Sequence, residues 1–166
     1  MTKRENIVNH QDLDWQETGQ GEKFGLKRKQ LGTASGAEKL GCSMIQLEPG
    51  KTAWPFHYHC ANEESIYVLE GEGTMRIGDR NEPVRAGDYI SFPIGPQHAH
   101  QLTNTGDAPL VYMCFSTMIE PDVMGYPDSG KMGVAAGSAP GGDASKRLHF
   151  EFHRSKNAVP YWDGEA

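Results

Sequence analysis

Three side chains with metal-binding chemistry stand close together near the middle of the chain: His57, His59 and Glu64. Residues two positions apart on an extended strand point to the same face, because strand side chains alternate. A carboxylate a few residues later can reach the same point after a short loop. A third imidazole comes from His98 or His100. Imidazole nitrogens with a carboxylate oxygen are typical ligands of one divalent first-row metal ion, so the sequence predicts such a site.

The residues around this cluster have the pattern of an all-β protein. Gly and Pro recur every eight to twelve residues or so between short runs of β-forming residues, which is typical of a sandwich or barrel. We expect strands at residues 24–31, 39–47, 64–70, 74–77, 89–92, 98–103 and 110–117. Turn residues predict a hairpin of 64–70 with 74–77, and another of 98–103 with 110–117. Residues 9–17 are the best candidate for a short helix.

The chain divides into three parts. Residues 1–23 form an N-terminal extension, residues 24–118 the β-barrel, and residues 119–166 a tail. Within the tail, residues 133–145 are rich in Gly, Ala and Ser, which indicates a flexible link. Residues at about 148–153 alternate apolar and polar side chains and predict a half-buried strand. That strand can return to its own barrel or add to the sheet edge of a partner.

The composition argues against several classes of partner. The 166 residues carry a formal net charge of −6 and no long run of Lys or Arg, so we expect no nucleic acid partner. No apolar stretch approaches the roughly 20 residues that span a bilayer, so we expect no membrane partner. Residues 1–20 lack an apolar signal core, and the three cysteines form no close pair. We therefore expect a cytoplasmic protein.

The cluster resembles the first sequence motif of the cupin superfamily, whose members are small β-barrels that hold a metal ion in the barrel mouth. That motif is a glycine, His-x-His, a glutamate and a second glycine, matched here by Gly50, His57, His59, Glu64 and Gly71. The spacing to the second glycine favours Glu64 over Glu63 as the ligand. Two spacings depart slightly from the motif: the segment before the first histidine is one residue longer, and the segment before the glutamate is at the long end of the usual range.

The second cupin motif is a glycine, Pro-x-Gly, a histidine and an asparagine. Gly87, Pro93, Gly95 and Asn104 match it, with either His98 or His100 as the histidine. His98 has the usual distance from the preceding glycine, whereas His100 has the usual distance to the asparagine. Both would lie on one face of a strand. We assign His100 as the third histidine ligand, because the asparagine turn fixes the strand register better than the loop before it.

The resemblance implies a single cupin barrel, which is a jelly roll or double-stranded β-helix, flanked by the N-terminal extension and the strand-bearing tail. It also implies one divalent transition metal ion, Zn, Fe, Mn, Ni or Co, held by the four assigned ligands. The chain also resembles small single-domain bacterial metal-binding cupins, through residues 61–71 and the Tyr-Pro-Asp-Ser-Gly-Lys run at 126–131. Some of those proteins are labelled sugar-phosphate isomerases by analogy.

Three functions fit this resemblance, all involving a small polar molecule. The first is a sugar-phosphate-isomerase-like enzyme, in which Glu63 or His98 is a candidate for moving a proton. The second is an Fe(II)-dependent dioxygenase, and the third is a non-catalytic ligand-binding protein. A phosphorylated substrate needs a cationic clamp, for which Arg76, Arg28 and Lys51 are candidates. We expect a homodimer, because cupin barrels commonly pair through sheet edges.

Overall fold

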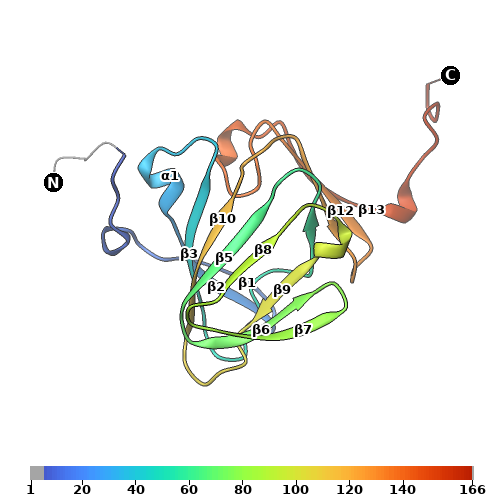
Figure 1. The fold of residues 1–166 in the computed structure, drawn as a ribbon. Coiled ribbons are helices and arrows are strands. Elements are labelled where there is room, and N and C mark those ends of the chain that lie inside the picture. The colour runs from blue at the N-terminus through green and yellow to red at the C-terminus, as the bar shows by residue number, and fades with distance from the viewer. Residues whose placement is uncertain (1–5, 166) are drawn as a thin grey trace.

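The computed structural model describes residues 6–165, and these residues form two facing layers of β-strands (Figure 1). The first layer is an antiparallel six-stranded sheet in the order β1-β2-β3-β10-β5-β8. Its strands are β1 (Gln16–Gln20), β2 (Phe24–Gln30), β3 (Gly41–Leu47), β10 (Leu110–Ser116), β5 (Glu64–Glu70) and β8 (Tyr89–Phe92). A short helix, α1 (Leu31–Ser35), connects β2 to β3.

The second layer consists of two smaller sheets that meet at the histidine cluster. One has the order β13-β12-β11-β4 and the other β7-β6-β9. Between them, His57 and His100 form an antiparallel bridge with two backbone hydrogen bonds of 3.2 and 2.8 Å. The strands are β4 (Tyr58–His59), β6 (Glu72–Ile77), β7 (Arg80–Arg85), β9 (His100–Thr103), β11 (Asp122–Tyr126), β12 (Lys131–Ala136) and β13 (His149–Arg154). Two layers joined in this way form the jelly roll that the sequence predicts.

The hydrophobic core lies between the two layers. Alternate residues of each strand point inward, as the period of a β-strand requires. On β3 these are Ile45 and Leu47, and on β5 they are Ile66 and Val68. The second layer contributes smaller numbers of buried side chains from β6, β7 and β9. The cluster contains Leu26, Ile45, Leu47, Ala53, Ile66, Val68, Met75, Val84, Phe92, Leu102, Leu110 and Tyr112.

The strand positions predicted from sequence are confirmed, with boundaries that differ by up to two residues, but both predicted hairpins are wrong. Strand β5 pairs with β10 and β8, whereas β6 pairs with β7 and β9. At Gly71, between β5 and β6, the chain crosses from one layer to the other. The backbone there has a φ of 81°, and a side chain would meet the carbonyl oxygen of Pro109 at 2.6 Å. This tight crossover resembles a hairpin turn in sequence.

The helix predicted at residues 9–17 is also wrong. Only a 3-10 turn, η1 (His10–Asp12), forms there, and β1 begins at Gln16. The segment is instead held against the barrel by Lys29, whose ammonium donates to the carbonyl oxygen of His10 at 2.8 Å and lies 4.6 Å from the Trp15 ring centre. Pairing with β2 thus outweighs the weak local helical preference. Residues 1–5 of the expected extension lie outside the described residues.

The tail returns to its own barrel as far as β13, whereas the residues after this strand project from it (Figure 1). Strand β11 pairs with β4 on one side and β12 on the other, and β13 pairs with β12. Residues 133–136, which the sequence assigned to a flexible link, belong to β12. Small residues are needed there because a side chain at Gly133 would meet the Phe152 ring at 2.8 Å. The predicted strand at about 148–153 is β13, but the expected half-burial is wrong, because all six residues of this outer strand are exposed.

Three 3-10 turns complete the fold: η2 (Pro96–His98), η3 (Ala144–Lys146) and η4 (Ser155–Asn157). None of the helices in residues 6–165 has the length and apolar character needed to cross a lipid bilayer.

Replacing Asn104 by alanine is expected to destabilise the fold. The fully buried Asn104 side chain donates to the carbonyl oxygens of Leu47 and Ala108 and accepts from the amide of Gly106. Losing these partners in a buried turn should lower the free energy of unfolding by roughly 3 kcal/mol. For a chain of this size that corresponds to a fall in Tm of roughly 6–12 °C, measurable by calorimetry. Asn81→Ala, at an exposed position on β7, is the control, and an equal loss in both variants would contradict this role.

Candidate metal centre

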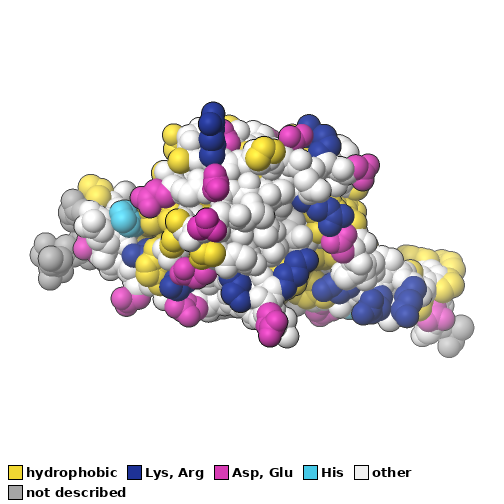
Figure 2. All heavy atoms as spheres, turned by 90° about the horizontal axis from the view of Figure 1, so that it is seen from below, with side chains coloured by type: hydrophobic (Ala, Val, Ile, Leu, Met, Phe, Trp, Pro, Cys, Tyr) yellow, Lys and Arg dark blue, Asp and Glu magenta, His cyan; other side chains and the backbone are white. Residues whose placement is uncertain are grey.

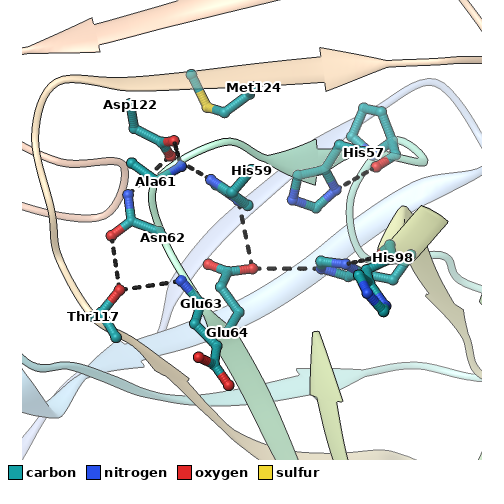
Figure 3. Close-up of polar contacts among 12 residues, drawn as sticks. His57, His59, Ala61, Asn62, Glu63, Glu64, His98, Thr117, Asp122 and Met124 are labelled. Carbon is teal, nitrogen blue, oxygen red and sulfur yellow. Dashed lines mark hydrogen bonds and ion pairs between the residues drawn. The ribbon is translucent and has the colours of Figure 1, made fainter. Parts of the chain in front are cut away.

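The side chains of His57, His59 and Glu64 point toward one another (Figure 3), and His100 joins them. One donor atom from each of His57, His59 and Glu64 can be chosen so that all three lie within 4.8 Å of one another. The Glu64 Oε2 atom lies 3.5 Å from the Nε2 atom of His59 and 3.4 Å from that of His100. The cluster thus joins three segments: the end of the loop into β4, the start of β5 and the start of β9.

Hydrogen bonds fix the orientation of all three imidazoles. The Nδ1 atom of His57 lies 2.8 Å from the carbonyl oxygen of Pro55, and that of His100 lies 3.1 Å from the carbonyl oxygen of His98. A carbonyl oxygen only accepts, so these two Nδ1 atoms must carry the proton. The Nδ1 atom of His59 lies 2.5 Å from the carboxylate of Asp122. The Nε2 atoms are left with their lone pairs free, as metal coordination requires.

The charge states also suit a cation. Burial, followed by the nearby charge of His100, lowers the pKa of His57 to about 3, so its imidazole is neutral at neutral pH. Burial alone would raise the pKa of Glu64, but the neighbouring His100, His59 and His57 rings outweigh burial and bring the pKa to about 2, so the carboxylate is ionised. An ionised carboxylate beside imidazole nitrogens is a donor set that could hold a divalent transition metal ion.

Asp122 is the residue of this centre that sequence reasoning missed. Its carboxylate is completely buried and accepts hydrogen bonds from the His59 ring, the Asn62 amide and the backbone N–H of Ala61. Burial would raise its pKa, yet the hydrogen bonds from His59 and Asn62 lower it, so the group stays ionised. Nothing in the local sequence marks it. It reaches the centre because β11 pairs with β4, a contact between segments 63 residues apart.

A second buried side chain, Asn62, holds the Asp122 carboxylate in place. Its amide nitrogen donates to Asp122 and to the carbonyl oxygen of Ile119, both at 2.9 Å. Its oxygen accepts from the backbone N–H of Ile119 and from the Thr117 hydroxyl. Because the segment after β10 is tied to Asn62, the chain is directed into β11 with Asp122 facing His59.

The two residues considered for proton transfer lie away from this point. Glu63 is exposed, and its carboxylate points away from the histidines in Figure 3. His98 is half-buried in η2 rather than on β9, which begins at His100. The expectation that both histidines share one strand is therefore wrong, because the turn that starts at Pro96 delays the strand. The carbonyl group of His98, not its ring, contacts the centre.

The donor atoms open into a large cavity. Its volume is 1510 Å³, and it extends from the barrel interior to α1 and to the segment 137–147 of the tail. Phe92 stacks on the His100 ring at 3.8 Å, and Tyr126 stacks on the His57 ring at 5.9 Å. Neither Glu63 nor His98 lines this cavity. Its walls near the centre include Ala53, Trp54, Ile66, Met75, Leu102, Tyr112, Cys114 and Met124.

Of the three cationic residues considered as a phosphate clamp, one lines the cavity. Arg76 forms two hydrogen bonds with the Asp128 carboxylate, at 2.8 and 3.0 Å, and its guanidinium lies over the Phe56 ring. Lys51 donates to the carbonyl oxygen of Glu22. Arg28 alone is part of the cavity wall.

Comparison with known proteins agrees with this architecture. Residues 43–116 match the family model described as the cupin domain. These residues form a cupin domain. In sequence, the chain is 38% identical over 60 residues to an uncharacterised protein of Methanocaldococcus jannaschii. That alignment spans 36% of this chain and less than half, 46%, of the archaeal protein.

Two solved structures extend the likeness beyond the cupin domain to nearly the whole chain. A proposed sugar phosphate isomerase from Acidithiobacillus ferrooxidans has a TM-score of 0.76 and 25% identity, covering 94% of this chain and 96% of that one. A cupin superfamily sugar phosphate isomerase from Silicibacter pomeroyi has a TM-score of 0.77 and 24% identity, covering 95% and 98%. The N-terminal extension and the tail are thus part of an architecture shared with these proteins.

Replacing Asp122 by asparagine is expected to weaken metal binding about 10- to 100-fold, as is usual when the acceptor behind a metal-binding histidine is lost. The amide cannot accept from His59, Asn62 and Ala61 together, and it removes the negative charge behind the imidazole. The measurement is competition for Zn²⁺ with a chromophoric chelator. Asp107→Asn, in an exposed loop, is the control. Equal affinities in the two variants would show that Asp122 does not support the centre.

Proposed function

We propose that His57, His59, Glu64 and His100 bind one divalent transition metal ion, and that the protein is a metal-dependent isomerase acting on a small sugar phosphate. The observation that carries this proposal is the fixed direction of the imidazoles. Proton acceptors hold the three Nδ1 atoms, which leaves the Nε2 atoms available to a metal ion, and those of His59 and His100 lie 3.5 and 3.4 Å from the Glu64 Oε2 atom. A set of packed histidines with no ligand role has no need for this shared orientation.

The donor set narrows the identity of the metal. Three imidazole nitrogens and one carboxylate oxygen suit Zn, Fe, Mn, Ni or Co and do not suit Mg or Ca, which prefer oxygen ligands. Four donors from the protein leave coordination positions for a substrate on the cavity side. When bound, the metal supplies Lewis acidity that polarises a carbonyl group of the substrate and makes the neighbouring C–H hydrogen easier to remove.

The residues of the chain supply positioning and shielding. The aromatic rings of Phe92 and Tyr126 cover His100 and His57, and they limit the access of water to the donors. Within residues 6–165 the Tyr126 hydroxyl makes one hydrogen bond, to the Met124 sulfur at 3.9 Å, and it is available to donate instead to a substrate oxygen. The group that moves the proton has to come from the cavity wall, and Glu63 and His98 are not part of it.

Three observations support a sugar phosphate as the substrate class. The cavity has room for a molecule of this size. A cation, Arg28, is part of its wall, as an anionic substrate would require. The protein of Acidithiobacillus ferrooxidans, which has the same fold over nearly its whole length, is a proposed sugar phosphate isomerase.

The test of this function is turnover. Metal-loaded protein, prepared separately with each candidate metal, is incubated with a panel of aldose and ketose phosphates with and without oxygen, and products are followed by NMR. We expect aldose–ketose interconversion that needs the metal and is independent of oxygen. His59→Ala should abolish it, whereas His149→Ala, exposed on β13, should not. Turnover that consumes oxygen would instead identify a dioxygenase, and ligand binding without any turnover would identify a binding protein.

We also propose that two copies of the chain associate through the tail. Strand β13 is the outer strand of its sheet, and the residues after it project from the barrel (Figure 1). Hydrophobic side chains gather on this projecting end, on the right of Figure 2. Tyr161 and Trp162 there are 85% and 75% exposed, and Phe150 and Phe152 on β13 are also exposed. A second copy of the chain would cover these aromatic side chains and the free edge of the strand.

Light scattering at micromolar concentration is expected to give twice the mass of one chain. Removing the residues after Arg154 should shift the protein toward the monomer, because the exposed aromatics at positions 161 and 162 are lost. Lys156→Ala, in the same segment, is the control for a general effect of altering the tail. A full-length protein that remains a monomer would contradict the proposed association.

A further inference from the structure

Arg28 is a cation that faces the interior of the barrel without a partner. In the sheet register it lies opposite Ile45, which in turn lies opposite Tyr112, and directly opposed residues of neighbouring strands share a face. Ile45 and Tyr112 are buried core residues, so the Arg28 side chain is directed inward with them. No hydrogen bond or ion pair of the Arg28 guanidinium is found within residues 6–165.

A second arginine reaches the same cavity from the tail. Arg147 follows η3, and its guanidinium lies over the Phe150 ring, 4.1 Å from the ring centre. Its Nε atom is the one buried side-chain nitrogen or oxygen without a hydrogen-bond partner in the described part of the chain. The segment that carries it is held to β2 by a 2.9 Å hydrogen bond from the Gln30 amide to the carbonyl oxygen of Gly141.

Arg28 and Arg147 both line this cavity. Burial is the main cause that lowers the pKa of Arg28, and the positive charge of Arg147 lowers it further. Four carboxylates line the cavity, on Glu38, Glu64, Glu120 and Asp143, but none of them forms an ion pair with either arginine. Two like charges at a partly buried site without a counter-ion are unfavourable, and an anion from solution would compensate both.

This pair shares the cavity with the metal centre. Cys114, half-buried on β10, lines this cavity together with Arg28, Arg147 and Glu64. Ile66, opposite Cys114, is two residues from Glu64 on β5. A molecule that binds the arginines with one end therefore extends along this wall toward the metal donors with the other.

We propose that Arg28 and Arg147 form a subsite for the phosphate monoester group of a small molecule. Each planar guanidinium can donate two parallel hydrogen bonds to phosphate oxygens, and two of them match the double negative charge of a phosphate monoester. The identity of the rest of the ligand, a sugar, rests on the proposed function. Binding of the phosphate group does not, because it needs no metal.

The test measures phosphate binding to the full-length protein in the presence of EDTA, which removes metal as an alternative site for the anion. Inorganic phosphate is titrated and followed by ³¹P NMR line broadening or calorimetry. We expect Arg28→Gln and Arg147→Gln each to weaken binding at least about tenfold, and Arg28→Lys to weaken it less, because lysine keeps the charge but loses the paired donors. Arg85→Gln, exposed on β7, should bind as the unmodified protein does.

Phosphate affinity that is the same in all four variants would overturn the proposal, as would preferential binding of acetate over phosphate. Thermal unfolding of each variant distinguishes loss of the subsite from loss of the fold. Arg147 lies outside the barrel core, so its variant remains informative even where Arg28→Gln is unstable. Zn²⁺ affinity is measured on the same variants. The phosphate subsite and the metal centre are then tested separately, because a variant can lose phosphate binding and keep Zn²⁺ binding, or the reverse.

Discussion

The pairing of β11 with β4 is the contact on which the centre depends. It brings Asp122 behind His59, and the carboxylate then sets the direction of the imidazole and accepts from two neighbouring donors. Asn62 and Ile119 secure the same junction from the other side. The buried Asp122 carboxylate is stable only with such partners. The position of the His59 ring therefore depends on the path of the chain after β10, and that path depends in turn on the ring.

A related constraint acts on the other two histidines. His57 and His100 bridge through their backbones, and each ring donates to a carbonyl oxygen two residues earlier in the chain. These carbonyl groups belong to irregular segments around Pro55 and to η2, whose conformations are set by proline. The loops beside the cluster therefore act as fixed acceptors for the ring protons, and the donors are oriented before any cation arrives.

Much of the barrel could be predicted from the sequence, because alternation and turn residues are local signals. Strands β5 and β8 coincide with the predicted residues, and His57, His59 and Glu64 are brought together as their spacing indicates. The pairing of strands is not a local property. The Gly71 crossover and a hairpin turn have similar sequences, and only the packing of two layers separates them. Asp122 and Arg147 lack any local signature, because their roles arise from the return of the tail to the barrel.

The cupin match ends at residue 116, whereas Asp122 and Arg147 lie beyond it. The residues that form the proposed site therefore extend beyond the segment that matches the cupin family. Substitutions in the appended strands can alter which molecules enter, and how firmly the imidazoles are held, while the inherited barrel stays unchanged. Ligand selectivity in such a chain can therefore change through the tail, which lies outside the match to the cupin family.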